Sequence, residues 1–142
     1  MKKLLVPALL TLAACNKKED TTVRQPDYDG KWYIHQVVEK EYTLEDGDTA
    51  YTRYDVKDYP GTANYMDFQI DRGKGNTIVY LDNKLDSMSY EAVSHVYFRL
   101  DTTLCEVTRV TDSTFQFNTL IFDGAPIPDR VQVTQHFFTL SR

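Results

Sequence analysis

Short runs in which apolar and polar residues alternate begin at Gly30 and continue to the end of the chain. β-branched and aromatic residues dominate these runs, and beyond Gly30 no window carries apolar residues at helical spacing. An alternation of period two puts one face of each strand on a core, so the pattern predicts an all-β domain. The expected strands are residues 31–44, 48–57, 63–70, 76–81, 90–100, 103–110, 114–122 and 129–141.

Seven turn-forming segments separate these eight expected strands. They are rich in Gly, Pro, Asn and Asp, which favour tight reversals, and lie at 46–47, 60–61, 72–75, 82–83, 101–102, 111–113 and 123–126. Connections of this length favour neighbouring antiparallel strands. Segment 82–89 has the weakest strand pattern, and a helical turn is the alternative there.

The hairpin expected at 101–102 gives a coherent register. It pairs Phe98 with Cys105 and Val96 with Val107, which makes one face apolar. A three-residue connection at 111–113 continues that face by pairing Val107 with Phe117.

A meander with one apolar face buries it either by closing on itself or by folding into two packed sheets, and closure also removes the exposed edges. We therefore expect residues 27–142 to form an eight-stranded antiparallel up-and-down barrel without a helix after the last strand. Small barrels of this kind are either packed or hold one small ligand, and the sequence leaves both open. The expected interior residues are Met66, Phe68, Ile70, Val96, Phe98, Cys105, Val107 and Phe117, and all of them except Ile70 are also candidate ligand-binding residues.

The N-terminus has the pattern of a secretory signal. Lys2 and Lys3 precede the apolar stretch 4–14, which is too short to span a bilayer, since a spanning helix needs about 20 residues. The run Leu12-Ala13-Ala14-Cys15 resembles the lipobox of bacterial lipoproteins. This resemblance implies that residues 1–14 are removed and that Cys15 is acylated, for example with palmitate, and so anchors the protein in a membrane.

Residues 15–26 are expected to form a flexible tether between lipid and barrel, because they are polar and without periodicity. Within them, Lys18-Glu19-Asp20 is similar to the export signals of surface lipoproteins in the Bacteroidota, and an ordinary solvated linker is the alternative. The expected location is the outer membrane, facing the periplasm or the cell surface.

Three points of the barrel sequence resemble the signature points of lipocalins in order and spacing. They are Gly30-Lys31-Trp32, Thr111-Asp112 and the final Arg142, and the resemblance spans about residues 28–142, whose ending is similar to that of small bacterial lipocalin-like lipoprotein domains. Closure brings the first strand beside the last, so we expect the Arg142 guanidinium to lie near the Trp32 indole and to seal one barrel end.

Arg109 is expected to point inward, opposite Phe115. One hypothesis has it neutralise the carboxylate of an acyl ligand, since a buried unpaired cation is costly. The other, which its position near the 111–113 turn favours, has it packed at the sealed end beside Trp32. The connections 45–48, 71–75, 101–102 and 123–128 are expected to frame an entrance at the opposite end.

The net charge and the composition exclude some classes of function. Sixteen basic residues face 21 acidic ones, with a net charge of −5 that becomes −7 once residues 1–14 are removed, so no nucleic-acid partner is expected. A hydrophobic content of 42% argues against disorder. After cleavage at Cys15, Cys105 is the one remaining cysteine of the domain, which leaves no internal disulfide.

Candidate chemistry is sparse. His35, His95 and His136 have no chelating spacing, so neither a metal nor another cofactor is expected. The glycine-containing run 72–76 precedes no predicted helix and is interpreted as a hairpin turn, and Cys105 is interpreted as an unreactive core residue.

We expect that the protein is not an enzyme and that it binds a small apolar or amphiphilic molecule without converting it. The alternative is a packed interaction or assembly module that contacts an envelope protein through a tyrosine-rich face such as Tyr51, Tyr54 and Tyr59.

Overall fold

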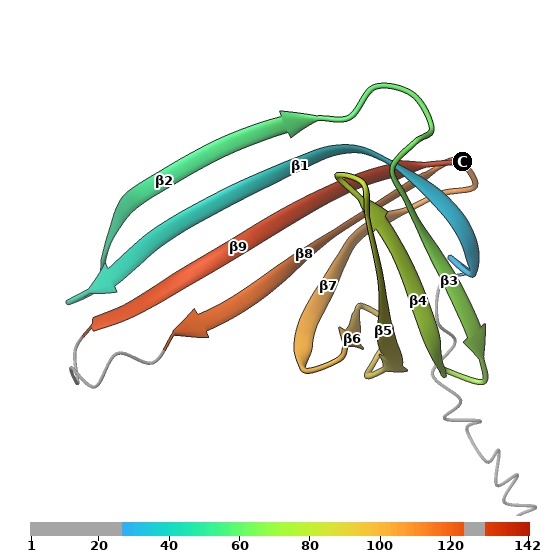
Figure 1. Cartoon of the computed structure of the whole chain (residues 1–142). Coiled ribbons are helices and arrows are strands. Elements are labelled where there is room, and N and C mark those ends of the chain that lie inside the picture. Colours follow the sequence, from blue (N-terminus) through green and yellow to red (C-terminus); the bar gives the residue numbers. More distant parts are fainter. Residues whose placement is uncertain (1–26, 124–129) are drawn as a thin grey trace, which may run out of the picture.

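The computed structural model describes residues 27–123 and 130–142, which form nine strands and no helix (Figure 1). The strands are β1 Gly30–Glu45, β2 Asp48–Asp58, β3 Tyr65–Asp71, β4 Lys74–Leu81, β5 Lys84–Ala92, β6 Tyr97–Leu100, β7 Thr103–Val110, β8 Thr114–Asp123 and β9 Arg130–Ser141. Every pairing between them is antiparallel. The predicted signal peptide, the predicted acylation site at Cys15 and the predicted tether lie outside the described residues.

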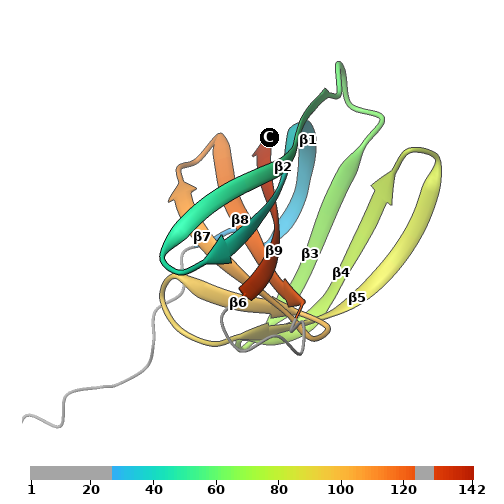
Figure 2. The same cartoon turned by 90° about the vertical axis from the view of Figure 1, so that its left-hand side faces the viewer.

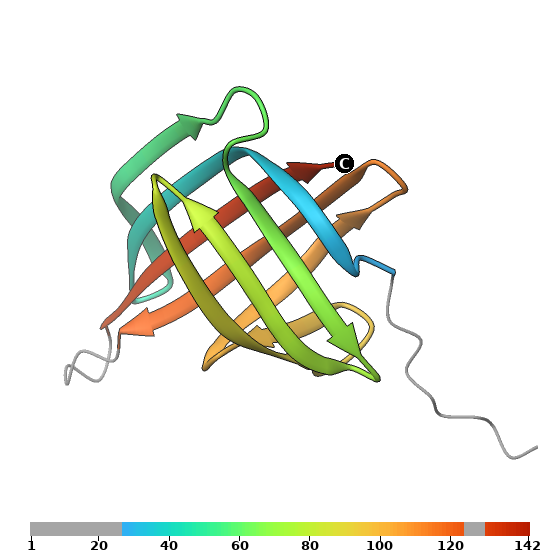
Figure 3. The ribbon, with the colours of Figure 1, turned by 45° about the vertical axis from the view of Figure 1, so that its right-hand side comes forward.

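Eight of these strands close a barrel, which confirms the predicted fold class (Figure 3). The order β1-β3-β4-β5-β6-β7-β8-β9 returns to β1, because β1 pairs with β3 on one edge and with β9 on the other. Neighbours in the ring are consecutive along the chain except where β2 intervenes. Closure therefore depends on β1, which is in contact with three other strands.

β2 lies beside the ring and not within it. Residues 30–33 of β1 pair with β3, and residues 36–45 of the same strand pair with β2. β2 and the aligned parts of β1, β9 and β8 (residues 36–45, 130–139 and 116–123) form a four-stranded sheet, and its far end projects past the other strands, as the left side of Figure 1 shows. We call this four-stranded sheet the extension. Residues 116–120 of β8 still pair with β7.

The predicted number of ring strands is right, but the prediction assigned the wrong strands to the ring at two places. It placed residues 48–57 in the ring, and it did not include most of β5. Asp82 and Asn83 both have positive φ angles, 52° and 62°, and form a two-residue hairpin between β4 and β5, so the helical alternative at 82–89 is wrong. The sequence pattern did not indicate β5, because most of its side chains are exposed and its polar residues obscure the alternation of apolar and polar positions.

The hairpin that was expected around 72–75 is present. Arg72 and Gly73 have φ angles of 50° and 80° and form the turn between β3 and β4. Gly75 follows in β4, where a Cβ atom would lie 1.9 Å from the Gln69 carbonyl oxygen. Close backbone approach therefore accounts for the second glycine of this run.

One end of the barrel, which we call the closed end, is filled by aromatic side chains. Tyr28 stacks on Phe115 with ring centroids 4.6 Å apart, and its hydroxyl bonds to the hydroxyl of Tyr90. The Trp32 indole N–H donates to the Tyr28 carbonyl oxygen at 2.8 Å. Burial of large aromatic rings gives this end most of its stabilisation. The other aromatic members of the core are Phe68, Phe98 and Phe117, together with Tyr59, whose hydroxyl reaches Asp82 toward the opposite end of the barrel.

Arg142 covers this closed end from outside. Its guanidinium carbon lies 4.1 Å from the centroid of the Trp32 ring, which confirms the expected contact between first and last strands. The same guanidinium donates to the Asp29 carbonyl oxygen, and the Arg142 N–H donates to the Ser113 carbonyl oxygen at 3.3 Å. The segment before β1, the end of β9 and the turn at 111–113 thus meet at one point.

Thr111 and Asp112 belong to that turn. The Thr111 hydroxyl accepts the N–H of Thr114 at 3.0 Å, so it holds the turn between β7 and β8. Asp112 is exposed.

The register of β6, β7 and β8 agrees with the prediction up to a β-bulge. Phe98 pairs with Cys105 and Val107 with Phe117, as expected. Between Val107 and Arg109 the register shifts by one residue, so that Val110 and not Arg109 lies opposite Phe115.

The expectation that Arg109 points inward is therefore wrong. It pairs with Gln116 and is exposed on the outside, which removes both its proposed contact with a ligand carboxylate and its packing beside Trp32.

Val96 is likewise wrongly assigned to the interior, since 46% of its surface is exposed. Residues 90–100 are not one strand. β5 ends at Ala92, the N–H groups of Val93 and Ser94 both donate to the Tyr97 carbonyl oxygen, and β6 begins at Tyr97.

We expect Arg142→Ala to lower the free energy of unfolding by about 1–2 kcal/mol, since it removes the contact with Trp32 and the bond to Asp29. Urea unfolding monitored by tryptophan fluorescence measures this. Arg109→Ala is the matched control, because an exposed side chain on the outer face contributes within about 0.5 kcal/mol. Equal stability of the two variants would contradict the role given to Arg142.

Candidate functional site

The end of the barrel opposite the aromatic core contains a cavity of about 550 Å³. It lies between the inner face of the extension and strands β3 to β7, and Figure 2 views the molecule from the side of the extension. Its apolar floor is lined by Val37, Met66, Leu81, Met88, Leu100, Cys105 and Phe138. The barrel is thus packed at one end and hollow at the other.

Much of the side of the cavity formed by the extension is polar, although Val37, Ile121 and Phe138 of the same sheet are apolar. Alternation along β1, β2 and β9 turns every second side chain toward the cavity, and on these strands many of those side chains are charged. Thr103 and Thr119 also line the cavity. We call the following residues the polar wall: Glu39, Arg53, Asp55, Lys57, Asp82 and His136.

Arg53 is the centre of one ionic group in this wall. Its guanidinium lies 2.5 Å from a carboxylate oxygen of Asp55, 3.0 Å from one of Glu39 and 3.7 Å from one of Glu41. On the other side of Glu39, the His136 Nε2 atom lies 3.5 Å from its second oxygen. Side-chain contacts therefore run without interruption from Arg53 on β2 through Glu39 on β1 to His136 on β9.

A second ionic group joins β2 to the turn between β4 and β5. Lys57 donates to the Asp82 carboxylate at 2.7 Å, and the Tyr59 hydroxyl donates to the same oxygen at 3.2 Å. The hydrogen bond from Lys57 holds the pKa of Asp82 below its usual value, and the same bond raises the pKa of Lys57. This contact connects the extension with the ring at the mouth of the cavity.

The candidate ligand-binding residues are divided between the cavity and the packed core. Met66 and Cys105 line the cavity. Phe68, Phe98 and Phe117 belong to the aromatic core, and Val107 packs against it while partly buried, as does the expected interior residue Ile70.

Sequence reasoning missed the polar wall, although β2 carried a signal for it. Arg53, Asp55 and Lys57 occupy alternate positions of one strand and therefore share a face. A row of charges at that spacing is ordinarily the solvent face, and here it faces the cavity because β2 lies on the extension.

The entrance is framed differently from the expectation. The turn at 72–73 belongs to the closed end, where the Gly73 carbonyl oxygen accepts the Ala92 N–H at 2.7 Å. Asp82 of the β4–β5 turn takes its place at the mouth, and Leu100 and Thr103 line the cavity on either side of 101–102. Residues 124–128 of the expected entrance lie outside the described part of the chain.

The outer face of the extension is unusually apolar for an exposed surface. Tyr51, Tyr54 and Phe122 are 61–65% exposed there, and Val56 and Val131 accompany them. Tyr59, which the tyrosine-rich face was expected to include, is buried instead.

In residues 27–123 and 130–142, no group of three or more His, Cys, Asp or Glu side chains is arranged to hold a metal ion. His35 bonds to the Ser141 hydroxyl, and His95 lies exposed in the turn before β6. The same residues contain no helix that is long and apolar enough to cross a bilayer.

No family model, no curated protein and no solved structure matches this chain. The fold and the cavity are therefore the basis for assigning a function.

Cys105 is fully buried at the cavity floor, and burial raises the pKa of its thiol to about 12. A thiol reacts as its thiolate, so the folded protein holds Cys105 in the unreactive form at pH 8. In the folded Cys15→Ser variant, whose one thiol is that of Cys105, we expect no reaction with Ellman's reagent at this pH and complete reaction in guanidinium chloride. Rapid native labelling would show that the floor is open to solvent.

Proposed function

We propose that this protein is a lipid-anchored, lipocalin-like lipoprotein of the bacterial outer membrane whose barrel binds a small amphiphilic molecule without chemical conversion. The cavity of about 550 Å³ carries the proposal. Ligand pockets are typically about 300–1,000 Å³ in volume and mostly apolar, with a few polar groups that orient the ligand.

The cavity's two sides suit the two parts of an amphiphile. Met66, Met88 and Phe138 offer apolar contact for a tail, while Glu39 and Arg53 offer polar partners for a head. Burial of the tail supplies the affinity, at roughly 25 cal/mol per Å² of apolar area, and the polar wall sets the orientation.

The alternative, an interaction module with a packed barrel, requires a filled interior. The cavity favours the ligand-binding protein over it, while the apolar outer face of the extension is the feature that speaks for a protein contact.

The proposed anchor is compatible with an open cavity. Tyr28 lies in the core of the closed end, so a tether that ends at residue 26 joins the barrel there. Twelve residues, 15–26, span at most about 40 Å when extended. The mouth is thus at the end of the barrel away from the proposed membrane attachment.

Acylation is tested by Cys15→Ser in the native host. We expect the variant to lose incorporation of labelled palmitate and to retain residues 1–14, because the thiol is the atom that the lipobox chemistry modifies. Mass spectrometry and palmitate labelling measure both. Cys105→Ser is the control and remains labelled; labelling of Cys15→Ser would overturn the proposed anchor.

Ligand binding is tested by filling the cavity. Met88→Trp places a larger side chain on the floor, and Ile121→Trp does so nearer the mouth, where partial exposure makes it tolerant. We expect both to weaken binding of a neutral fluorescent probe, N-phenylnaphthylamine, by at least about tenfold, which corresponds to ~1.4 kcal/mol.

The matched control is Leu85→Trp, on the same strand as Met88 but 69% exposed. It keeps the affinity of the unmodified barrel. Equal affinity of all variants, each shown to be folded by circular dichroism, would mean that the probe binds elsewhere and would overturn the proposal.

A further inference from the structure

The charges around Arg53 are unevenly balanced. One guanidinium faces the carboxylates of Glu39 and Asp55, which line the cavity, and that of Glu41 behind them, all within 4 Å. His136, 3.5 Å from the second oxygen of Glu39, adds a positive charge only when it is protonated, so this part of the polar wall has a local excess of negative charge when His136 is neutral. Glu39 is the least exposed of the three, at 27%, and carboxylates that are partly withdrawn from water favour a neighbouring positive charge.

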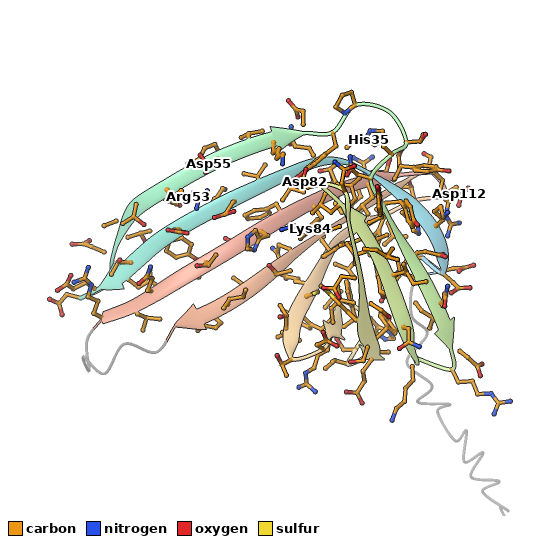
Figure 4. All side chains as sticks on the ribbon, viewed as in Figure 1. His35, Arg53, Asp55, Asp82, Lys84 and Asp112 are labelled. Atoms are coloured by element: carbon orange, nitrogen blue, oxygen red, sulfur yellow. The ribbon has the colours of Figure 1, made fainter. Side chains whose placement is uncertain are left out.

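The other ionic group does not share this excess. Asp82 is paired with Lys57, and Lys84 is close enough to contribute to the lowered pKa of Asp82. Figure 4 marks Arg53 and Asp55 on β2, and Asp82 and Lys84 at the turn across the mouth. The negative excess is thus local to the β1–β2 side of the cavity.

This distribution of charge affects which charged head group of an amphiphilic ligand the cavity can bind. An anionic head meets Arg53 and Lys57, whose positive charges are already balanced by the carboxylates of Asp55, Glu39 and Asp82, so its attraction to them is largely cancelled. A cationic head meets Glu39 and Asp55, two carboxylates that share the one guanidinium of Arg53, and adds positive charge where carboxylates outnumber guanidinium groups. Like-charge contacts cost free energy and opposite-charge contacts lower it, so the two heads differ in affinity.

We propose that the cavity selects a single-chain amphiphile with a cationic, ammonium-type head, which lies between Glu39 and Asp55 while the tail contacts the apolar floor. The inference rests on the proposed binding function and adds the chemical class of the ligand.

The experiment compares three ligands that differ only in the head: dodecylamine, dodecanol and dodecanoate. Each competes with N-phenylnaphthylamine, below its micelle concentration and at low salt, for the chain from residue 15 onward with Cys15→Ser. At pH 8 the amine and the carboxylate are both ionised. We expect dodecylamine to bind about tenfold more tightly than dodecanoate, with dodecanol between them.

Two double variants locate the effect. Glu39→Gln with Asp55→Asn removes the negative excess, and we expect it to reduce the preference for dodecylamine to within about twofold. The control, Asp71→Asn with Asp112→Asn, changes the net charge equally but at exposed positions of the closed end, and it keeps the preference. Probe affinity reports in each case that the cavity is intact.

The outcomes separate the two proposals. Equal binding of the three ligands, or tightest binding of dodecanoate, overturns the cationic head and leaves the binding function standing. A preference that both double variants lose equally assigns it to net charge and also overturns the inference. Absence of probe and ligand binding to the unmodified barrel overturns the proposed function itself.

Discussion

The pairing of β1 with β9 is the contact on which the rest of the structure depends. It joins the first and last strands, so the remaining ring strands enclose an interior and the sheet has no open edge within the ring. The same pairing brings Arg142 over Trp32 and lets the segment before β1 insert Tyr28 among the core aromatics. Because β1 is 16 residues long, it completes the ring with its first residues and still supports β2 with its last.

The barrel interior is packed at the closed end and hollow where the extension forms its wall. At the closed end, most of the large inward side chains are aromatic and pack against one another, together with aliphatic residues such as Ile34 and Leu140. Along the extension, the same inward positions carry Glu39, Arg53 and His136, which pair with one another instead of filling space. A wall of paired charges remains partly hydrated, so the interior stays open there. The sequence thereby produces a cavity by changing the type of inward-facing residue from one end of the strands to the other.

Most of the strands and turns could be predicted from the local sequence, but the cavity and its polar wall could not. Turn residues such as Asp46 and Gly47, with φ angles of 51° and 86°, marked hairpins correctly because their preference is intrinsic. The bulge before Arg109 and the attachment of β2 outside the ring depend on the curvature of the assembled sheet, which no short window encodes. Met66 and Cys105 were recognisable as interior residues, but the side of the interior that is hollow follows from which strands face each other across the axis.

β2 has β1 as its one hydrogen-bonded neighbour among the described strands, whereas each strand of the ring has at least two. Detaching β2 breaks a single ladder and leaves the ring whole, so its local opening requires less free energy than opening any ring strand. Arg53, Asp55 and Lys57 all lie on β2. Fraying of this strand therefore opens the polar side of the cavity and leaves the aromatic end undisturbed, so exchange between the cavity and solvent depends on one hairpin.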